Sequence, residues 1–343
     1  MSETVIAIVH NEPVCSGSPF SESSLDVLVQ VEAVETALKE LEYASVRIPF
    51  VRPIERFVSR IMDEKVTMAF NLCETVDEDP GFAGHPAALL ELLQIPFSGS
   101  PAMALMITTD KSVTQRLLSA SGIVTPRFVT YHAREPFSVE TLRFPVIVKP
   151  TLQDASIGID QESIFETEKA LKRRVGDLYK CFGSLLIEEY IDGREFNISL
   201  FGYPSAATLP LAEIDFSGFP EGLYPIVGYR AKWDATSLEY QNTLRKFPRN
   251  LPPLLAKLME RTALECFSLL KLRDYGRVDV RVDGSDKVHV LEINANPCLS
   301  PDAGFAAAAG QSGMTYSEII ARLVSFMNQR TGKDDCQIGH APG

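Results

Sequence analysis

Short runs of β-branched residues alternate with longer stretches of helical periodicity along the first third of the chain. In order, the pattern predicts a strand at 5–9, a helix at 25–41, strands at 46–50 and 66–72, and a helix at 86–93. This alternation is typical of a parallel sheet with crossover helices, and thus of an α/β fold. Proline and glycine interrupt the pattern at 95–101, so we expect an N-terminal α/β domain over 1–100.

The remaining pattern mixes strands and helices less regularly, as in α+β domains. It predicts a helix at 109–121 capped by Thr108 or Thr109, strands at 128–131, 145–150 and 185–190, a helix at 166–180, strands from 195 to about 230, a helix at 252–270, strands at 276–283 and 287–294, and a helix at 315–330. A short connector at 191–194, which contains Gly193, separates the strand at 185–190 from the strands that begin at 195. We therefore expect a central domain over 101–190, a C-terminal domain over 191–332 and a flexible tail over 333–343.

Composition narrows the class of protein. The 343 residues include 33 Lys and Arg against 45 Asp and Glu, a net charge of -12, which disfavours binding to nucleic acid or to an anionic membrane surface. No apolar run reaches the length of a membrane span, and the first residues do not resemble a signal peptide. Six scattered cysteines without a CxxC pair are typical of reduced thiols, so we expect a cytoplasmic protein.

The segment 276–297 carries the most informative chemistry. Arg277 and Asp279 alternate with valines on one predicted strand, and Glu292 and Asn294 share a face of the next. An antiparallel hairpin would bring all four polar side chains together. Oxygen ligands grouped in this way suit Mg²⁺, which commonly bridges protein carboxylates and nucleotide phosphates.

Four segments, of which this hairpin is the last, resemble segments that occur in the same order in the ATP-grasp enzymes, and within them in the D-alanine–D-alanine ligase group. They are Asp110-Lys111 at the start of a helix, the sequence FPVIVKP at 144–150, the sequence IEEYIDGREF at 187–196, and the hairpin 276–297. The segment 88–100 resembles the N-terminal domain of the same group. Because the four segments keep their order over nearly the whole chain, the resemblance implies the three-domain ATP-grasp fold.

The resemblance implies an ATP site between the last two domains. The implied ATP-binding residues are Lys111, Lys149, Ser156, Glu188, Tyr190, Ile191, Glu195 and Lys232. Among them, Glu188 would accept from the adenine amino group and Glu195 from the ribose hydroxyls. Lys232 corresponds to a lysine on a mobile loop that reaches the γ-phosphate when the loop closes.

The implied metal ligands are Asp279, Glu292 and Asn294, with Mg²⁺ as the ion and Mn²⁺ as an alternative. Arg277 corresponds to the arginine that stabilises negative charge on the reacting carboxyl group. The implied reaction has two steps: a carboxylate attacks the γ-phosphate to give an acyl phosphate and ADP, and an amine then attacks the carbonyl. The implied partners are small carboxylate and amine substrates and a second copy of the chain, paired through the N-terminal domain.

The substrate site departs from the D-alanine pattern. Ala155 and Trp233 occupy positions where the group has Ser and Tyr, and the matching Glu is absent near Ser24 unless the alignment places Glu22 there. Glu74 is a candidate catalytic residue as a binder of the substrate amine.

A second departure follows the metal ligands. Asp302 stands where the group binds a second carboxylate, which favours an amine that is cationic or lacks a carboxylate; the alternative is that Asp302 caps a following helix. Cys298 replaces a glycine whose amide helps to bind the oxyanion.

We therefore expect an ATP- and Mg²⁺-dependent carboxylate–amine ligase with an altered substrate site. Three alternatives remain open at this point. The first is an authentic D-alanine–D-alanine ligase of cell-wall synthesis, and the second is a non-catalytic ATP-binding module with a regulatory role. The third, an ATP-grasp carboxylase, would need a biotin-carrying partner.

Overall fold

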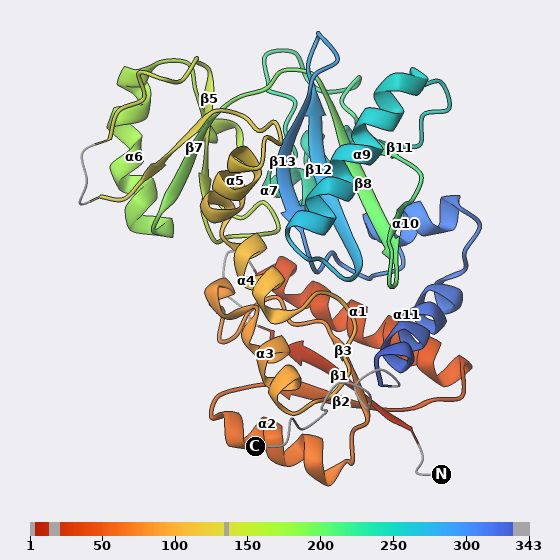
Figure 1. Ribbon diagram of the computed structural model, residues 1–343. Coiled ribbons are helices and arrows are strands. Elements are labelled where there is room, and N and C mark those ends of the chain that lie inside the picture. Colours follow the sequence, from red (N-terminus) through yellow and green to blue (C-terminus); the bar gives the residue numbers. More distant parts are fainter. Residues whose placement is uncertain (1–3, 14–20, 134–136, 332–343) are drawn as a thin grey trace, which may run out of the picture.

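The computed structural model describes residues 4–13, 21–133 and 137–331, without the side chains of 21–24 and 331. The predicted tail at 333–343 and the side chains of Glu22 and Ser24 lie outside this description. The described chain forms three sheets with helices packed around them, as Figure 1 shows. No helix among the described residues is long and apolar enough to cross a membrane.

The N-terminal sheet is parallel, with strand order β2-β1-β3. Its elements are β1 (Val5–Asn11), α1 (Ser21–Glu40), β2 (Ala44–Phe50), α2 (Ile54–Asp63), β3 (Met68–Asn71), the 3₁₀ helix η1 (Pro80–Phe82) and α3 (His85–Leu92). The central strand β1 is buried because Ile6, Ala7, Ile8 and Val9 are fully enclosed. The predicted parallel sheet is confirmed; helix α2 was not predicted.

The central unit is a four-stranded antiparallel sheet with order β4-β7-β5-β6. Its elements are α4 (Ala102–Thr109), α5 (Lys111–Ala120), β4 (Phe128–Tyr131), β5 (Val146–Pro150), the 3₁₀ helix η2 (Gln161–Ser163), β6 (Ile164–Phe165), α6 (Glu168–Phe182) and β7 (Leu185–Glu189). Apolar side chains of the strands, Val146, Val148 and Ile187, pack against Leu171 and Val175 of α6.

The predicted helix over 109–121 is confirmed as α5, which begins at Lys111, whereas α4 was not predicted and the predicted cap is wrong, because the two helices meet at Asp110. Asp110 is the N-cap of α5, and its carboxylate accepts hydrogen bonds from the backbone amides of Ser112 and Val113. Thr108 and Thr109, the predicted caps, lie inside α4 and donate their hydroxyl hydrogens to carbonyls one turn back.

The C-terminal unit is built on a six-stranded antiparallel sheet with order β11-β10-β8-β12-β13, in which β9 also pairs with β8. Its elements are β8 (Arg194–Gly202), β9 (Ala207–Thr208), β10 (Ala212–Asp215), α7 (Tyr229–Trp233), α8 (Leu238–Gln241), β11 (Leu244–Lys246), α9 (Pro253–Leu269), β12 (Asp274–Val282), β13 (Val288–Asn294), α10 (Gly304–Gln311) and α11 (Tyr316–Thr331). The expectation of strands up to residue 230 is wrong beyond Asp215. Pro220 and Pro225 cannot donate to a strand ladder, and α7 begins at 229.

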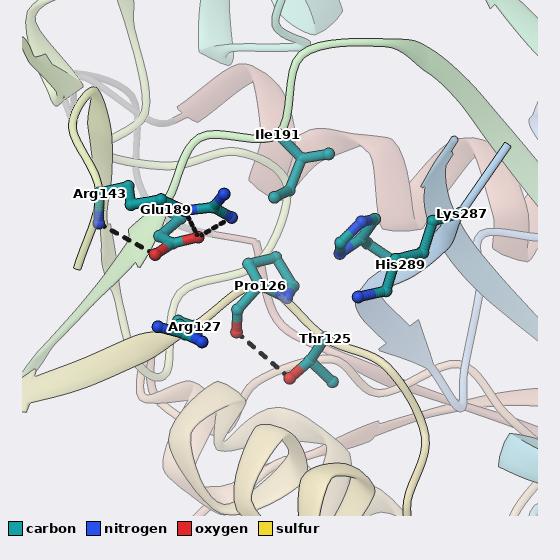
Figure 2. A pocket seen from close by; sticks show the side chains of 8 residues that line it. All are labelled: Thr125, Pro126, Arg127, Arg143, Glu189, Ile191, Lys287 and His289. Carbon is teal, nitrogen blue, oxygen red and sulfur yellow. Dashed lines mark hydrogen bonds and ion pairs between the residues drawn. The ribbon is translucent and has the colours of Figure 1, made fainter. Parts of the chain in front are cut away.

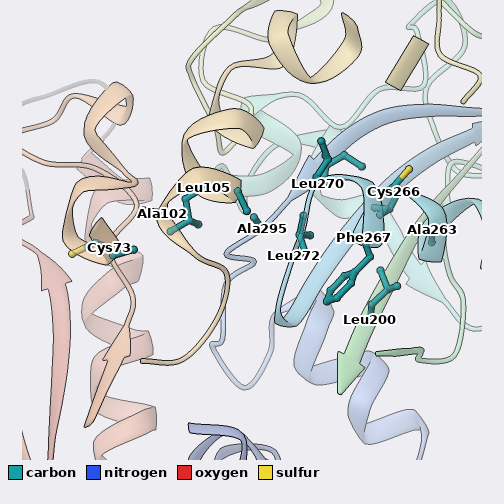
Figure 3. Close-up of a cluster of buried hydrophobic side chains, with 14 of the residues drawn as sticks. Cys73, Ala102, Leu105, Leu200, Ala263, Cys266, Phe267, Leu270, Leu272 and Ala295 are labelled. Atoms are coloured by element: carbon teal, nitrogen blue, oxygen red, sulfur yellow. The ribbon is translucent and has the colours of Figure 1, made fainter. Parts of the chain in front are cut away.

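Helix α11, at the end of the described chain, packs against α1 near its beginning (Figure 1). Val31 and Val34 of α1 share one buried cluster with Ile320 and Leu323 of α11. A second cluster runs from Cys73 through α4 to the large sheet, as Figure 3 shows. The N-terminal unit and the large sheet therefore share cores. The predicted domain limits at 100, 190 and 332 stay a prediction.

Candidate active site

Strands β12 and β13 form the predicted antiparallel hairpin, which is confirmed. Arg277 lies opposite Asn294 and Asp279 lies opposite Glu292 in the strand register. The hairpin is irregular, since the register shifts between Asp279 and Val280, and Val280 pairs with Val290. Leu291 is thus the extra residue of a β-bulge.

The bulge decides which face the carboxylate of Glu292 occupies. Val290 and Glu292 are two positions apart, so a regular strand would place both side chains on one face. With the extra residue, Val290 and Ile293 are both buried with Val278 and Val280, while Glu292 stays on the polar face. The hydrophobic core and the polar site can therefore occupy opposite faces of one hairpin.

Asp279 is the centre of a hydrogen-bond network on this face. The Arg277 guanidinium donates to both carboxylate oxygens of Asp279, at 2.7 and 2.8 Å. The amides of Asn197 on β8 and of Asn294 donate to Asp279 at 2.8 and 3.2 Å. Burial alone would lower the pKa of Arg277, but the Asp279 carboxylate more than offsets this and raises the pKa. Asn197 was not identified from the sequence, because no motif marks it.

Glu292 is paired with Lys111 at the start of α5. The Lys111 ammonium lies 2.8 Å from Glu292 Oε1 and 2.9 Å from Asp154 Oδ1, and donates to the carbonyl of Gln153 at 2.7 Å. Burial acts to raise the pKa of Glu292, but Lys111 and then Lys232 outweigh burial and hold the pKa at about 2. Glu292 is therefore ionised at neutral pH.

The residues at the hairpin fit a magnesium ion that takes most of its ligands from phosphate and water rather than from the protein. Among the described residues, no group of three or more His, Cys, Asp or Glu side chains is arranged to hold a metal. Asp279 and Glu292 supply two carboxylates, and Asn294 donates through Nδ2, which leaves its amide oxygen as an acceptor. Two carboxylates with an amide oxygen suit Mg²⁺ when phosphate oxygens and water complete its octahedral shell.

Strand β7 places two adjacent glutamates on opposite faces. Glu188 is almost completely buried, with Oε1 at 2.5 Å from the Lys149 ammonium of β5, and its Oε2 has no hydrogen-bond partner in the described structure. Glu189 points to the other face, where it pairs with Arg143. An unpartnered, buried carboxylate oxygen is an acceptor positioned for a ligand N–H group.

Glu195 on β8 is held by a buried arginine that was not identified from the sequence. The Arg281 guanidinium donates to Glu195 Oε2 from two nitrogens, at 2.9 and 3.1 Å. It also donates to the carbonyls of Ile191, at 2.8 Å, and Pro225. Because both bonds to Glu195 use Oε2, Oε1 is left for a hydroxyl donor. Arg281 also lies over the Tyr190 ring, with 5.0 Å between the guanidinium carbon and the ring centroid.

Two loops meet over the hairpin. Ala155 and Ser156 both have positive φ, 54° and 60°, conformations that cluster at ligand-binding loops. The Ser156 hydroxyl donates to the carbonyl of Val227 at 2.8 Å, and the Trp233 indole donates to the carbonyl of Ala155 at 3.0 Å. These bonds fasten the loop 153–158 to α7 and bring Lys232 into the site.

Lys232 is partly buried among charges of both signs. Burial, and next the positive charge of Arg277, lower the pKa of Lys232, while Glu292 and Asp279 oppose this shift. Tyr190 and Ile191 follow β7 in the connector to β8, where Ile191 is buried. The structure therefore gathers these predicted residues where the central and C-terminal sheets adjoin, a region that is called the active-site cleft below.

The N-terminal unit contributes a second acidic group. Gln30 on α1 donates its amide hydrogens to Asp26 and Glu74, both at 3.2 Å, and accepts from the backbone amide of Leu299 at 3.0 Å. Burial raises the pKa of Glu74 to about 7, with Asp26 adding to the shift. Asp26 and Gln30 were missed because on sequence they are ordinary polar positions of an amphipathic helix.

Cys298 lies beside this acidic group. Its thiol donates to Asp26 Oδ2 at 3.2 Å. Burial, and next the charge of Asp26, raise the pKa of the Cys298 thiol, so the thiol is protonated at neutral pH. This protonation state does not suit a nucleophile.

Arg245 on β11 is a further cation that the sequence did not indicate. Its guanidinium donates to the backbone carbonyl of Asp302 at 3.4 Å, and a side chain at Gly304 would contact it. Burial and the neighbouring charge of Arg277 lower the pKa of Arg245, and the Asp302 carboxylate opposes this shift. Asp302 is exposed, and it does not cap α10, because the N-cap is Ala303 without a side-chain bond. The predicted capping role is therefore wrong.

Fold and site together define a protein of the ATP-grasp class. The family model described as D-ala D-ala ligase C-terminus matches residues 117–325. The chain belongs to this family, and the predicted D-alanine–D-alanine ligase-like identity, the fold and the carboxylate–amine ligase class of enzyme are confirmed.

Relatives and solved structures agree with this assignment. The chain is 33% identical over 264 residues to the protein y4sG of Sinorhizobium fredii, covering 77% of this chain and 75% of that protein. It is 28% identical over 296 residues to the D-alanine–D-alanine ligase of Aquifex aeolicus, covering 86% and 93% of the two chains.

Two solved structures share the fold at low sequence identity. The D-alanine–D-alanine ligase of Bacillus anthracis complexed with ATP superposes with a TM-score of 0.76 at 21% identity, covering 96% of this chain and 99% of that one. The D-alanine–D-alanine ligase of Coxiella burnetii gives 0.72 at 16% identity, covering 98% and 97%.

Proposed function

We propose that the protein is a cytoplasmic, ATP- and Mg²⁺-dependent ligase that joins a small carboxylate to an amine through an acyl phosphate. The observation that carries the proposal is the convergence of Lys111, Lys232 and Arg277 on Asp279 and Glu292. A cluster with cations and carboxylates on one sheet face suits phosphoryl transfer, because it can position phosphates and a divalent ion together.

The family resemblance assigns a role to each of these residues, and the contacts of each residue are compatible with its role. Glu188 Oε2 would accept from the adenine amino group, Glu195 Oε1 from a ribose hydroxyl, and the connector at Tyr190 and Ile191 would line the base. The loop 153–158, with Lys149, would hold phosphate oxygens. Asp279, Glu292 and the Asn294 amide oxygen would hold Mg²⁺, which neutralises phosphate charge when it is bound.

In the first step, a carboxylate oxygen bonds to the γ-phosphorus and the bond to the ADP oxygen breaks. In the second step, the amine bonds to the acyl carbon, phosphate leaves and the amine loses a proton. Arg277 would stabilise negative charge at the acyl group in both steps. The bonds from Ser156 and Trp233 hold the loops closed over the site, which excludes water from an acyl phosphate that hydrolyses readily.

The acidic group formed by Asp26 and Glu74 favours a first substrate that carries an ammonium group. Two carboxylates joined through Gln30 would bind this cation and favour ionisation of Glu74.

The expectation that Asp302 repels an acceptor carboxylate assumed that the Asp302 charge has no cation beside it. Since Arg245 lies beside Asp302 and near Arg277, we propose that an acceptor carboxylate binds between the two arginines.

The test is ADP release from Mg²⁺-ATP. D-alanine alone is compared with a panel of amino acids and other carboxylates crossed with amines, diamines and peptides, and Glu292→Ala is the blank. Turnover that depends on a pair of substrates supports the ligase, and Arg245→Ala should then raise the KM of a carboxylate-bearing acceptor about tenfold. Turnover on D-alanine alone would identify an authentic D-alanine–D-alanine ligase. Bound ATP without turnover on any pair would favour the non-catalytic module.

The homodimer implied by the resemblance also remains a proposal. Sedimentation equilibrium of the full chain tests it directly, because the mass of a dimer is twice that of the 37.9 kDa chain. A monomer at all concentrations would contradict the proposal without affecting the proposed reaction.

A further inference from the structure

A cavity of about 390 Å³ lies at the hinge where the chain passes from the central sheet to the large sheet. Its walls come from four segments: 125–127 before β4, Arg143 before β5, Glu189 at the end of β7 with Ile191 just after it, and Lys287 with His289 at the start of β13. Figure 2 shows side chains from all four segments around the cavity. Its volume lies within the range of about 300–1,000 Å³ that is typical of small-molecule sites.

The hinge cavity is distinct from the candidate active site. Successive side chains of a strand point to opposite faces, so Glu188 and Glu189 belong to different surroundings. Glu188 pairs with Lys149 in the active-site cleft, whereas Glu189 pairs with Arg143 at the wall of the cavity. None of the predicted ATP-contacting side chains other than Ile191 lines it.

Positive charge exceeds negative charge around the cavity. Arg127, Arg143 and Lys287 line it, against the single carboxylate of Glu189. Arg143 is engaged, since its Nε and Nη2 donate to Glu189 at 3.2 and 2.8 Å. Within the described parts of the chain, the Arg127 guanidinium and the Lys287 ammonium form no ion pair, as the close-up in Figure 2 also shows for the drawn residues. A local excess of cations is notable in a chain with a net charge of -12.

A buried histidine supplies the second, independent observation. His289 is only 6% exposed, and its Nε2 lies 3.0 Å from Asp283 Oδ2. Because a carboxylate accepts, Nε2 carries the hydrogen, and Nδ1 is left without a hydrogen-bond partner in the described structure. The ring points from β13 toward Pro126 and Ile191 (Figure 2). A buried ring nitrogen without a partner is costly unless a ligand or water satisfies it.

We propose that the hinge cavity binds a small phosphate-bearing anion. Arg127 and Lys287 would contact the phosphate oxygens, and His289 Nδ1, an acceptor in this tautomer, would accept a hydrogen bond from a P–OH or alcohol hydroxyl of the same ligand. Since the walls belong to both the central sheet and the large sheet, the bound anion stabilises one relative arrangement of the two. The ligand therefore acts on the opening of the cleft without entering it, and the site does not depend on the proposed reaction.

The experiment is isothermal titration of the full chain with inorganic phosphate and, separately, with glycerol 3-phosphate. The hinge variant is R127Q/K287Q, and the matched control is K172Q/R174Q, which removes the same charge from the exposed face of α6. A third variant, K149Q, removes a cation of the active-site cleft. We expect the hinge variant to bind at least about tenfold more weakly at the hinge cavity, while the control keeps the wild-type affinity and K149Q keeps the hinge-cavity binding. The far-ultraviolet circular dichroism of each variant confirms folding.

Tighter binding of glycerol 3-phosphate than of phosphate would identify a phosphorylated metabolite as the ligand, and the reverse would identify free phosphate; both outcomes support the proposal. Binding that is lost in K149Q and kept in the hinge variant would place the anion in the active-site cleft and overturn it. Absence of binding by either anion to the wild-type chain would also overturn it.

Discussion

Lys111 and Glu292, which lie far apart in the sequence, form a salt bridge of 2.8 Å in the candidate active site. The Lys111 side chain is 6% exposed and that of Glu292 is 26% exposed, so water screens the pair only weakly. The salt bridge joins the first turn of α5 to strand β13. It therefore connects helix α5 to the hairpin that carries the proposed metal ligands.

Replacing Lys111 by Met should destabilise the protein, because Glu292 and Asp154 would lose a buried cation. Removing one partner of a buried pair costs about 3–5 kcal/mol, and we expect about 3 kcal/mol because Glu292 is partly exposed. Urea denaturation measures the change. The control is Lys172→Met, which breaks an exposed pair with Glu168 on α6 and should cost no more than about 0.5 kcal/mol. Equal losses in both variants would contradict the buried-pair account.

Glu74 should make stability depend on pH. Its pKa in the folded protein is about 7, above the 4.5 of the free group, chiefly through burial. The folded state therefore binds more protons than the unfolded state between these values, and the contribution of Glu74 to stability falls as the pH rises from 4.5 to 7. We expect Glu74→Gln to raise the free energy of unfolding relative to wild type more at pH 8 than at pH 5, by about 1–2 kcal/mol.

Chemical denaturation of Glu74→Gln and the wild type at several pH values between 5 and 8 tests the sign. A difference that is constant across this range would show that Glu74 titrates at its ordinary pKa. A cationic substrate gives a second readout, since it favours the ionised carboxylate, and its affinity for the wild type should increase as the pH rises through about 7.

Glu188 should set the preference for adenine. A carboxylate oxygen that accepts from the adenine amino group would repel the carbonyl that guanine carries at the same position. Glu188→Gln should raise the KM for ATP about tenfold or more, given the strength of hydrogen bonds to charged groups, and should reduce the discrimination against GTP. The matched control is Glu189→Gln, whose side chain faces Arg143 on the other side of β7. If both variants shifted the ATP to GTP ratio alike, the assignment of Glu188 would fail.

Trp233 should report on the loop that carries Lys232. It is the only tryptophan of the chain, and its indole nitrogen donates to the carbonyl of Ala155 at 3.0 Å. Mg²⁺-ATP should change the tryptophan emission, because the loop 153–158 is proposed to hold the phosphates, and Lys149→Gln should weaken the ATP dependence of this change. Trp233→Phe removes one neutral hydrogen bond and should lower the rate of ADP release about three- to tenfold. If the chain binds ATP but its tryptophan emission does not change, the proposed link between Trp233 and the phosphate-binding loop is contradicted.

Local sequence determined most of the elements and the chemistry of the hairpin. Alternation placed Arg277 and Asp279 on one face, and helical periodicity located α1, α6, α9 and α11 because each buries a single face. Predictions were wrong where capping and proline decided the outcome: Asp110 caps α5 in place of Thr108 or Thr109, and the strands end at Asp215. Glu292 and Asn294 reach the polar face through a bulge at Leu291 that no local pattern indicates.

Tertiary structure alone decided which polar groups meet. Gln30 meets Glu74, Arg281 holds Glu195, and Arg245 lies beside Asp302, although the partners of each pair are at least 44 residues apart in the sequence. Periodicity indicates only which face of a helix or strand is buried, because the pattern repeats within that element and does not identify the element that packs against it. Which charges become neighbours depends on how helices and strands from distant parts of the chain pack, so these contacts required the folded structure.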